Sequence, residues 1–413
     1  MERKLGAYIH IPFCASKCAY CDFYSLSGCD RFLPRYHSAV IEHIRQSSQQ
    51  MQDYFIDTVY FGGGTPSYYG ARRLGEIFNA LKRYALVYKT AEVTVECNPD
   101  SVTRRALNVM REDGVNRLSI GAQSANEDLL KILGRRHSWV EVERTVKTAR
   151  KAGFENISLD LIYGIPSQSR ADWAETLSRA VELNPDHISC YGLKLEEETP
   201  LYSYRDSPLL PDDDEQADMY LYMVETLERF GYKQYEISNF ARPGFQSKHN
   251  LKYWQMRDYI GFGPGAHSFV GGIRYSYIKS IGRYIKGIQN EDNILDEYEP
   301  IAPIGRAAEY IMLGLRTTRG ISEREYRSLY RSDFAPLEEQ FREYEYKGWA
   351  RFENDRWRLT PPGFLLSNLL IGTLLDRQSE HKVSGNPWMD ADDVIPDRGE
   401  LPAGDEIFYR SRK

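Results

Sequence analysis

Three cysteines near the start of the chain have the residue type and spacing of a metal-cluster site. Cys14, Cys18 and Cys21 are spaced C-x3-C-x2-C in the string HIPFCASKCAYCDF, directly after a short apolar run. A structural zinc site or an ordinary ferredoxin cluster uses four ligands. Three thiolates would hold three irons of a four-iron cubane and leave the fourth iron open for a substrate, by the logic of a catalytic metal site. The alternative is three incidental cysteines, but this spacing is unusual for zinc and does not suit a thioredoxin-type pair.

The other three cysteines are not expected to be ligands. Cys29 follows Cys21 by eight residues, which makes it a poor fourth ligand, and Cys97 and Cys190 lie far along the chain. Six cysteines in 413 residues do not make a disulfide scaffold. Thiolate ligands need a reducing compartment, which favours the cytoplasm.

Further polar residues come at the ends of apolar segments. Gly62-Gly63-Gly64-Thr65 follows one such segment, but it lacks the G-x4-G-K-[ST] pattern of a phosphate loop. Its glycines would let a ligand lie against the backbone. Glu96 and Arg135 suit the two charged ends of an amino acid, because a carboxylate holds an ammonium and a guanidinium fork grips a carboxylate. Taken singly, each is equally a satisfied polar residue at a strand end.

The first 240 residues alternate strand and helix signals with turn residues between them. We predict strands over residues 7–11, 58–61, 93–96, 117–120, 157–161 and 187–193. The predicted helices cover residues 33–47, 71–84, 104–111, 140–152 and 171–181. Such βα repeats imply an α/β fold with a parallel sheet and right-handed crossovers. Six units fit an open, partial (β/α)6 barrel, although periodicity alone does not distinguish it from a doubly wound sheet.

Both architectures gather functional loops at the carboxyl ends of the strands. The cysteine loop follows the first strand and the glycine loop follows the second. Glu96 closes the third strand, Gln123 lies just past the fourth and Asp160 lies within the fifth. Five elements therefore deliver ligand or polar residues to one face.

The character of the chain changes near residue 301. Helices are predicted over residues 306–315, 322–330, 337–347 and 363–375, with a hairpin over 351–359 that turns at Asn354-Asp355. This order resembles a small winged-helix-like α+β domain. We therefore predict a core over residues 1–300, a C-terminal domain over 301–376 and a polar, acidic, loosely packed tail over 377–413.

Composition sets broad limits on function. The chain is 42% hydrophobic and 13% aromatic, so it can bury a large core, and its net charge of −6 gives no reason to expect a nucleic-acid or membrane partner. No run of 18 apolar residues exists, and the first residues, MERKLGAYIH, contain no leader-like apolar region. We expect a cytoplasmic protein without a transmembrane segment, as a monomer or a dimer.

The string Tyr8-x-His10-Ile11-Pro12-Phe13-Cys14-x3-Cys18-x-Tyr20-Cys21 resembles the signature of the radical S-adenosylmethionine superfamily. More narrowly, it resembles the oxygen-independent coproporphyrinogen III oxidase family, and within it the haem chaperone branch. The resemblance runs from Tyr8 to about residue 375. It implies the (β/α)6 barrel and a [4Fe–4S] cluster on Cys14, Cys18 and Cys21. It also implies chemistry in which a reduced cluster cleaves S-adenosylmethionine to a 5′-deoxyadenosyl radical.

The resemblance assigns the strand-end residues to S-adenosylmethionine. The glycine loop would cradle the methionine part, Glu96 and Arg135 would hold its charged ends, and Gln123 and Asp160 could hold the ribose hydroxyls. The matched set is Tyr8, Gly62, Gly63, Gly64, Thr65, Glu96, Gln123, Arg135 and Asp160.

A second string, HNLKYW over residues 249–254, resembles the H-N-x-x-Y-W motif associated with haem in the chaperone branch. An imidazole from His249 can ligate haem iron, and the rings of Tyr253 and Trp254 offer flat faces to a porphyrin. The alternative is that His249 is a hydrogen-bonded structural residue in an aromatic corner. Residues 261–267 are expected to form a tight loop bordering the same site, and His10 is expected to be structural.

Two departures from the oxidase pattern favour the chaperone branch. Oxidases of the family carry a cysteine two residues after the third ligand, where this chain has Phe23, and they have a longer segment before the residue equivalent to Tyr8. We therefore predict a protein that binds haem and passes it to an acceptor protein. The alternatives are coproporphyrinogen III oxidase and a radical enzyme acting on RNA. Residues 322–360 carry eight Lys/Arg against nine Asp/Glu, which argues against RNA.

Overall fold

Six parallel strands form the centre of a curved sheet in the computed structural model, which describes residues 2–331 and 333–383. They are β1 (Arg3–Ile11), β4 (Tyr54–Gly63), β5 (Leu86–Cys97), β6 (Arg117–Gln123), β7 (Asn156–Tyr163) and β8 (His187–Gly192). They lie side by side in chain order. A doubly wound sheet reverses its strand order at a switch point. The unreversed order therefore confirms the open barrel, and all six predicted strands are present.

Short strands extend this sheet at both ends and were not predicted. Beyond β8 come β10 (Asn239–Ala241) and β9 (Lys233–Gln234), both antiparallel to their neighbours. Beyond β1 come β11 (Tyr259–Phe262), which is parallel to β1, and then the antiparallel strands β12 (His267–Val270), β13 (Ile273–Tyr277) and β14 (Leu295–Pro300). The described sheet has 12 strands and stays open between β9 and β14.

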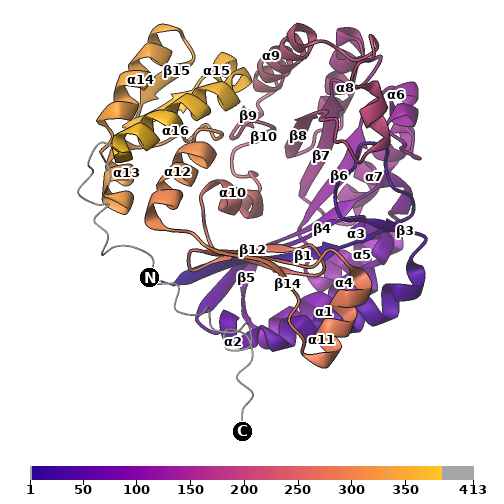
Figure 1. Ribbon diagram of the computed structural model, residues 1–413. Coiled ribbons are helices and arrows are strands. Elements are labelled where there is room, and N and C mark those ends of the chain that lie inside the picture. Colours follow the sequence, from indigo (N-terminus) through magenta and orange to yellow (C-terminus); the bar gives the residue numbers. More distant parts are fainter. Residues whose placement is uncertain (1, 332, 384–413) are drawn as a thin grey trace.

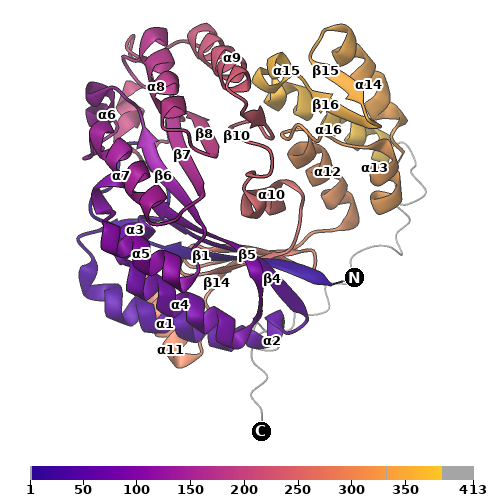
Figure 2. The same ribbon diagram turned by 180° about the vertical axis from the view of Figure 1, so that it is seen from behind.

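Helices cover the convex side of the sheet (Figures 1 and 2). The five predicted helices are α1 (Leu33–Gln46), α4 (Ala71–Tyr84), α5 (Arg104–Asp113), α7 (Trp139–Lys151) and α8 (Arg170–Glu182), and α9 (Asp213–Arg229) and α11 (Ile281–Asn290) add to them. Capping boxes at Ser138 and Ser169 fix the starts of α7 and α8. The remaining short elements of the core are β2 (Phe13–Cys14), β3 (Leu26–Ser27), η1 (Asp30–Phe32), α2 (Ser48–Met51), α3 (Pro66–Tyr69), η2 (Pro99–Ser101), α6 (Glu127–Ile132) and η3 (Pro200–Tyr204).

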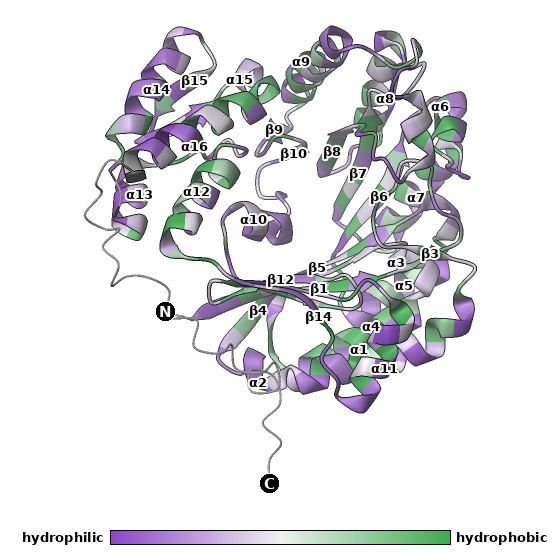
Figure 3. Cartoon of the chain, viewed as in Figure 1, coloured by the Kyte–Doolittle hydropathy of each residue, from purple (hydrophilic) through white to green (hydrophobic). Residues whose placement is uncertain are grey.

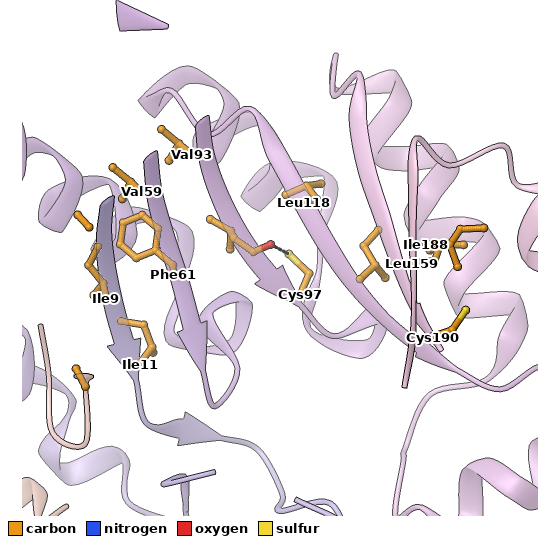
Figure 4. Packing of buried hydrophobic residues seen from close by; sticks show 14 of the residues in the cluster. Ile9, Ile11, Val59, Phe61, Val93, Cys97, Leu118, Leu159, Ile188 and Cys190 are labelled. Atoms are coloured by element: carbon orange, nitrogen blue, oxygen red, sulfur yellow. Dashed lines mark hydrogen bonds between the residues drawn. The ribbon is translucent and has the colours of Figure 1, made fainter. Parts of the chain in front are cut away.

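Alternation along the strands separates an apolar core from a polar barrel interior. Residues such as Ile9, Val59 and Leu118 point toward the helices and are fully buried (Figure 4). Cys97 and Cys190 belong to the same apolar cluster. The alternate positions carry polar side chains that face the concave side. The strands therefore bury one face and use the other for chemistry.

Residues 301–383 form a separate group of elements beside the open side of the sheet (Figure 1). They comprise α12 (Pro303–Gly314), α13 (Glu323–Tyr330), α14 (Ala335–Tyr346), the hairpin β15 (Ala350–Glu353) and β16 (Arg356–Leu359), α15 (Pro361–Leu365) and α16 (Ser367–Val383). The hairpin turns at Asn354 and Asp355, which both have positive φ, as a two-residue type I′ turn requires.

The final helix differs from the prediction in two ways. The single helix predicted over 363–375 is two helices, because α15 ends before Leu366 and α16 begins after it. Helix α15 begins with two prolines, and Thr360 is its N-cap residue. Helix α16 continues to Val383, so residues 377–383, predicted to begin the tail, are helical. The rest of the predicted tail lies outside the described residues.

A short helix, α10 (Lys248–Trp254), lies on the concave side of the sheet and contains the predicted haem motif. It is mostly hydrophilic in Figure 3, in contrast to the mixed faces of the outer helices. Across residues 2–331 and 333–383, no helix combines the length and apolar character needed to cross a membrane.

Candidate functional site

The three predicted ligand cysteines lie in one loop at the carboxyl ends of the strands. Cys14 ends β2 and is buried, while Cys18 and Cys21 are half-buried, and all three are free thiols. Backbone bonds fix the loop: the amide of Ala19 donates to the carbonyl of Leu133 at 3.0 Å, and the amide of Leu201 donates to the carbonyl of Ala19 at 3.1 Å. Burial raises the pKa of the Cys14 and Cys21 thiols. A metal must therefore displace a proton from each of these thiols.

The cysteine loop fits a cluster better than a single ion. Nowhere in the described ranges do three His, Cys, Asp or Glu side chains converge closely enough to hold one metal ion. Ligands of a cubane each bind a different iron, so they need not converge on one point. The buried hydroxyl of Ser25 faces Cys14 and Cys21, and hydrogen bonding from it opposes the rise in the pKa of both thiols. Such a donor suits the sulfide or thiolate sulfur of a cluster.

The glycine loop packs directly on the cysteine loop. The amide of Gly64 donates to the carbonyl of Ile11, and the amide of Thr65 donates to the carbonyl of Phe13, both at 2.8 Å. Gly63 has a φ of +107°, and a Cβ there would lie 2.5 Å from the His10 ring. A Cβ on Gly64 would lie 2.8 Å from the Ile11 and Phe13 carbonyl oxygens. The glycines are therefore required by close contact as well as by backbone conformation.

Glu96 points into the barrel at the level of the glycine loop. Its carboxylate accepts from the Tyr60 hydroxyl at 2.9 Å and from the Gly63 amide at 3.2 Å. Burial raises the pKa of Glu96 to about 7, and the Tyr60 and Gly63 donors oppose that rise. Desolvation and the nearby Asp160 charge thus disfavour the ionised carboxylate, and a ligand ammonium would stabilise it.

Asp160 and Gln123 lie on the next two strands of the same face. The hydroxyl of Ser119 donates to both carboxylate oxygens of Asp160, at 3.0 and 3.1 Å, and burial raises the pKa of this carboxyl. Gln123 has a positive φ of 64° at an irregularity in the pairing of β6 with β7. A strained, non-glycine residue of this kind is typical of binding sites. A Cβ on Gly121 would meet the Gln123 amide at 2.8 Å and Arg135 at 3.0 Å, which places these two side chains close together.

Arg135 links the polar residues to the cysteines. Its Nη1 donates to the sulfur of Cys18 at 3.3 Å, and its Nη2 donates to the Asn98 side-chain oxygen at 2.7 Å and to the Gly121 carbonyl at 3.1 Å. Its buried Nε finds no acceptor among the described residues. This unused donor suits a ligand carboxylate beside the cluster cysteines.

Asn98 was not among the predicted site residues. Its Nδ2 donates to the Thr65 hydroxyl at 3.4 Å, and that hydroxyl donates to the sulfur of Cys14 at 3.4 Å. The only signal in the sequence is its place two residues after Glu96, at the same strand end. An Asn before Pro99 is otherwise typical of a helix cap or turn, which explains why it was passed over.

The predicted haem residues lie one layer deeper in the barrel. His249 is fully buried, and both ring nitrogens are hydrogen-bonded at 2.8 Å, Nδ1 to Thr58 and Nε2 to Tyr253. Its ring stacks on Tyr60 at 5.2 Å and on Tyr8 at 6.4 Å. In this arrangement neither nitrogen is open to iron. The geometry matches the alternative of a hydrogen-bonded residue in an aromatic corner.

Helix α10 is anchored in the barrel by charges that the sequence did not reveal. Lys252 is 3% exposed and pairs with Asp57 at 2.7 Å. The Glu92 carboxylate accepts from the backbone amides of Lys248 and His249 at 3.2 and 3.1 Å. Of the three predicted haem residues, Tyr253 and Trp254 are half-buried. They are therefore more accessible than His249.

Three other residues of the sequence analysis lie around the cysteine and glycine loops. His10 bonds the Tyr8 hydroxyl through Nδ1 at 3.1 Å and the Tyr24 carbonyl through Nε2 at 2.8 Å, which fits the predicted structural role. Of residues 261–267, predicted as a tight loop, only 263–266 form a turn, because β11 ends at Phe262 and β12 begins at His267. Gly263 lies against β1, because a Cβ there would be 2.6 Å from the His10 carbonyl oxygen. Phe23, which occupies the position of the oxidase cysteine, is 65% exposed beside the cysteine loop.

Comparisons with known proteins identify the family of this chain. A model of the radical SAM superfamily matches residues 8–180, and a model of the HemN C-terminal domain matches residues 301–366. Proteins named heme chaperone HemW from Lactococcus lactis subsp. lactis (strain IL1403) and Bacillus subtilis (strain 168) are each 34% identical to this chain. The alignments cover 89% and 90% of this chain, and 96% and 99% of those proteins. The chain belongs to the HemW family.

The solved structure of coproporphyrinogen III oxidase (HemN) from Escherichia coli has the same fold as this HemW-family chain. The two superpose with a TM-score of 0.79 over 90% of each chain at 22% sequence identity. That likeness shows the fold alone. Membership in the radical SAM superfamily implies a four-iron cluster and S-adenosylmethionine as cofactors.

Proposed function

We propose that this chain is a haem chaperone that holds a [4Fe–4S] cluster, binds S-adenosylmethionine beside it and delivers haem to an acceptor protein. The observation that carries the proposal is the near full-length relationship to proteins named heme chaperone HemW. Cys14, Cys18 and Cys21 would hold the cluster. The cytoplasm, where thiolate ligands stay reduced, would be its compartment.

The residues around the cysteines fit S-adenosylmethionine. Glu96 would pair with its ammonium, and the unused Nε of Arg135 would bind its carboxylate. Asp160 and Gln123 would hold the ribose, with Tyr8 on the adenosyl side. When bound, S-adenosylmethionine supplies a sulfonium carbon–sulfur bond that one electron from a reduced cluster can cleave. The protein's part is to orient the sulfonium and to exclude water.

For haem we propose the region around α10, with Tyr253 and Trp254 as stacking residues. His249 would become an iron ligand only if its bond to Tyr253 or its bond to Thr58 opened. The core over residues 1–300 would bind the cofactors, and the unit over residues 301–376 would pack against it. Phe23 in place of a cysteine supports the chaperone over the oxidase.

The test is anaerobic reconstitution of the whole chain with iron and sulfide. The loaded protein is assayed in parallel for haem retention on gel filtration, for haem transfer to an apo-haemoprotein, and for conversion of coproporphyrinogen III. We expect retained and transferable haem and no converted porphyrinogen. Cys14→Ala should lose the cluster absorbance, while Cys29→Ala, the matched control, should keep it. Stoichiometric protoporphyrinogen IX with no retained haem would restore the oxidase.

A further inference from the structure

Asn98 lies between Thr65, which donates to the Cys14 sulfur, and Arg135, which donates to the Cys18 sulfur. It immediately precedes η2, yet its side chain makes no cap bond to that helix. Its backbone is fixed instead: the amide donates to the Ser67 hydroxyl at 3.1 Å, and the carbonyl accepts from the Ser101 amide at 3.0 Å. The backbone bonds therefore fix the position of Asn98, and its side chain is available for bonds to other residues.

The chemistry of the neighbours fixes the orientation of the Asn98 amide. A guanidinium only donates, so the side-chain oxygen must face Arg135 and the NH2 group must face Thr65. Because the Thr65 oxygen accepts from Asn98, its own hydrogen is directed to the Cys14 sulfur. The other arm of Arg135 ends on the Cys18 sulfur. The Asn98 side chain thus orients two donors: the Thr65 hydroxyl toward Cys14 and the Arg135 guanidinium toward Cys18.

We propose that Asn98 is a positioning residue that sets the reduction potential of the cluster and couples it to the grip of Arg135 on the S-adenosylmethionine carboxylate. Donors to ligand sulfurs stabilise the more negative, reduced cluster and so raise its potential. The Asn98 oxygen also fixes the guanidinium plane, which leaves Nε as the edge for the carboxylate. This inference rests on the proposed cluster and S-adenosylmethionine site.

The experiment uses the reconstituted full chain and Asn98→Ala. Three quantities are measured: iron per chain, midpoint potential by dye-mediated titration followed by electron paramagnetic resonance, and S-adenosylmethionine affinity by calorimetry. We expect full iron, a more negative potential and roughly three- to tenfold weaker binding, the equivalent of about one net hydrogen bond. The matched control is Asn116→Ala. Asn116 is half-buried like Asn98, and both polar atoms of its side chain are hydrogen-bonded. Its partners are the Val93 amide and the Ala91 carbonyl, at the other end of the strands.

Thr65→Val tests the hydrogen bond to Cys14. It removes the donor to the Cys14 sulfur and leaves Asn98 and Arg135 paired, so the reduction potential should fall. In the Thr65→Val background, Asn98→Ala should lower the reduction potential by less than it does in the wild-type background. If Asn98→Ala reconstitutes poorly, Thr65→Val still tests the hydrogen bond to Cys14.

The outcomes distinguish this inference from the proposed function. Full iron with unchanged potential and unchanged affinity in Asn98→Ala overturns the inference and leaves the cluster assignment standing. An unchanged potential in Thr65→Val overturns the role of the hydrogen bond to Cys14. A wild-type chain that forms no cluster, or a Cys14→Ala variant that keeps full iron, overturns the proposed function itself.

Discussion

Glu96 is the residue whose protonation we expect to control S-adenosylmethionine binding. Its pKa is raised to about 7 by burial, so near neutral pH the unliganded side chain is partly protonated. An ammonium pairs only with the ionised form. Affinity measured by calorimetry should therefore rise between pH 6 and pH 8 by roughly tenfold, one decade per pH unit below the pKa.

Glu96→Gln is the control for this pH dependence. The amide oxygen can still accept from the Gly63 amide while the NH2 group donates to the Tyr60 oxygen. The side chain carries no titratable charge, so binding should be weaker and should not change with pH. The sign for stability is opposite to that for binding. A carboxyl with a raised pKa holds its proton more tightly in the folded state, so its contribution to the free energy of unfolding falls as pH rises from about 4.5 toward 7. Equal affinity at pH 6 and pH 8 in the wild type would contradict this role.

Sequence patterns single out site residues where the chemistry is unusual for its position. A carboxylate at Glu96 and a cysteine at Cys14 are conspicuous at strand ends. Asn98 was missed because the same residue type is common in turns, and its role depends on Arg135, 37 positions away in the chain. The resemblance of residues 249–254 to a haem-associated motif singled out His249, yet only the fold shows that both of its ring nitrogens are already hydrogen-bonded.

At the scale of elements, the segment after β4 offers a matched pair of glycine substitutions. Gly63 and Gly70 both have strongly positive φ, 107° and 109°. Only at Gly63 would a Cβ collide with a neighbouring element, 2.5 Å from His10, whereas at Gly70 the nearest atom is an arginine tip at 3.8 Å. Gly63→Ala and Gly70→Ala should therefore share a backbone cost of about 1–2 kcal/mol. Only Gly63→Ala should also weaken S-adenosylmethionine binding, by about tenfold or more in calorimetry, and equal binding by both variants would count against the loop contact.

Helix α10 separates a structural role from a haem role within one motif. Removing the buried His249 ring leaves the hydroxyls of Thr58 and Tyr253 without their partner, so His249→Ala should lower the free energy of unfolding by about 2–4 kcal/mol. Trp254 is only half-buried. Trp254→Ala should lower the free energy of unfolding by less than His249→Ala does, and it should weaken haem binding by more. Denaturant unfolding and Soret titration of both variants check the pair, and a His249→Ala variant of normal stability that binds no haem would reverse the assignment.

Strand alternation explains why the barrel was predictable and its extensions were not. The six parallel strands bury one apolar face along several residues each, which gives a strong local signal. Strands β9 and β10 have only two and three residues. Their pairing depends on β8, far earlier in the chain, so no local pattern marks them.

At the scale of the whole molecule, α12 and the residues after it bridge the two ends of the open sheet. Glu309 on α12 pairs with Arg274 on β13 at 2.8 Å. At the other end, the Ile237 amide donates to the Arg316 carbonyl at 2.9 Å, and the Thr318 amide donates to the Tyr235 carbonyl at 3.1 Å. Because these contacts join both sheet ends to residues 301–383, we expect the core and the C-terminal unit to unfold together.

Trp357→Ala tests this coupling from the C-terminal side. Trp357 is 2% exposed, stacks on Phe341 at 5.0 Å and pairs through its backbone with Ile321. Its removal should cost about 3–5 kcal/mol. The full chain should keep a single calorimetric transition at a lower temperature, and hydrogen exchange should speed up in β9, β10 and β13 as well as in residues 301–383.

Phe352→Ala is the matched control, because Phe352 contacts the same ring but is 45% exposed. It should leave the transition nearly unchanged. If Trp357→Ala instead produced two transitions, or faster exchange confined to residues 301–383, the C-terminal unit would be an independent domain. A single transition with faster exchange at both ends of the sheet would mean that this unit helps to hold those two ends in place around α10. It would then also help to fix the distance between the proposed haem region and the cysteine loop.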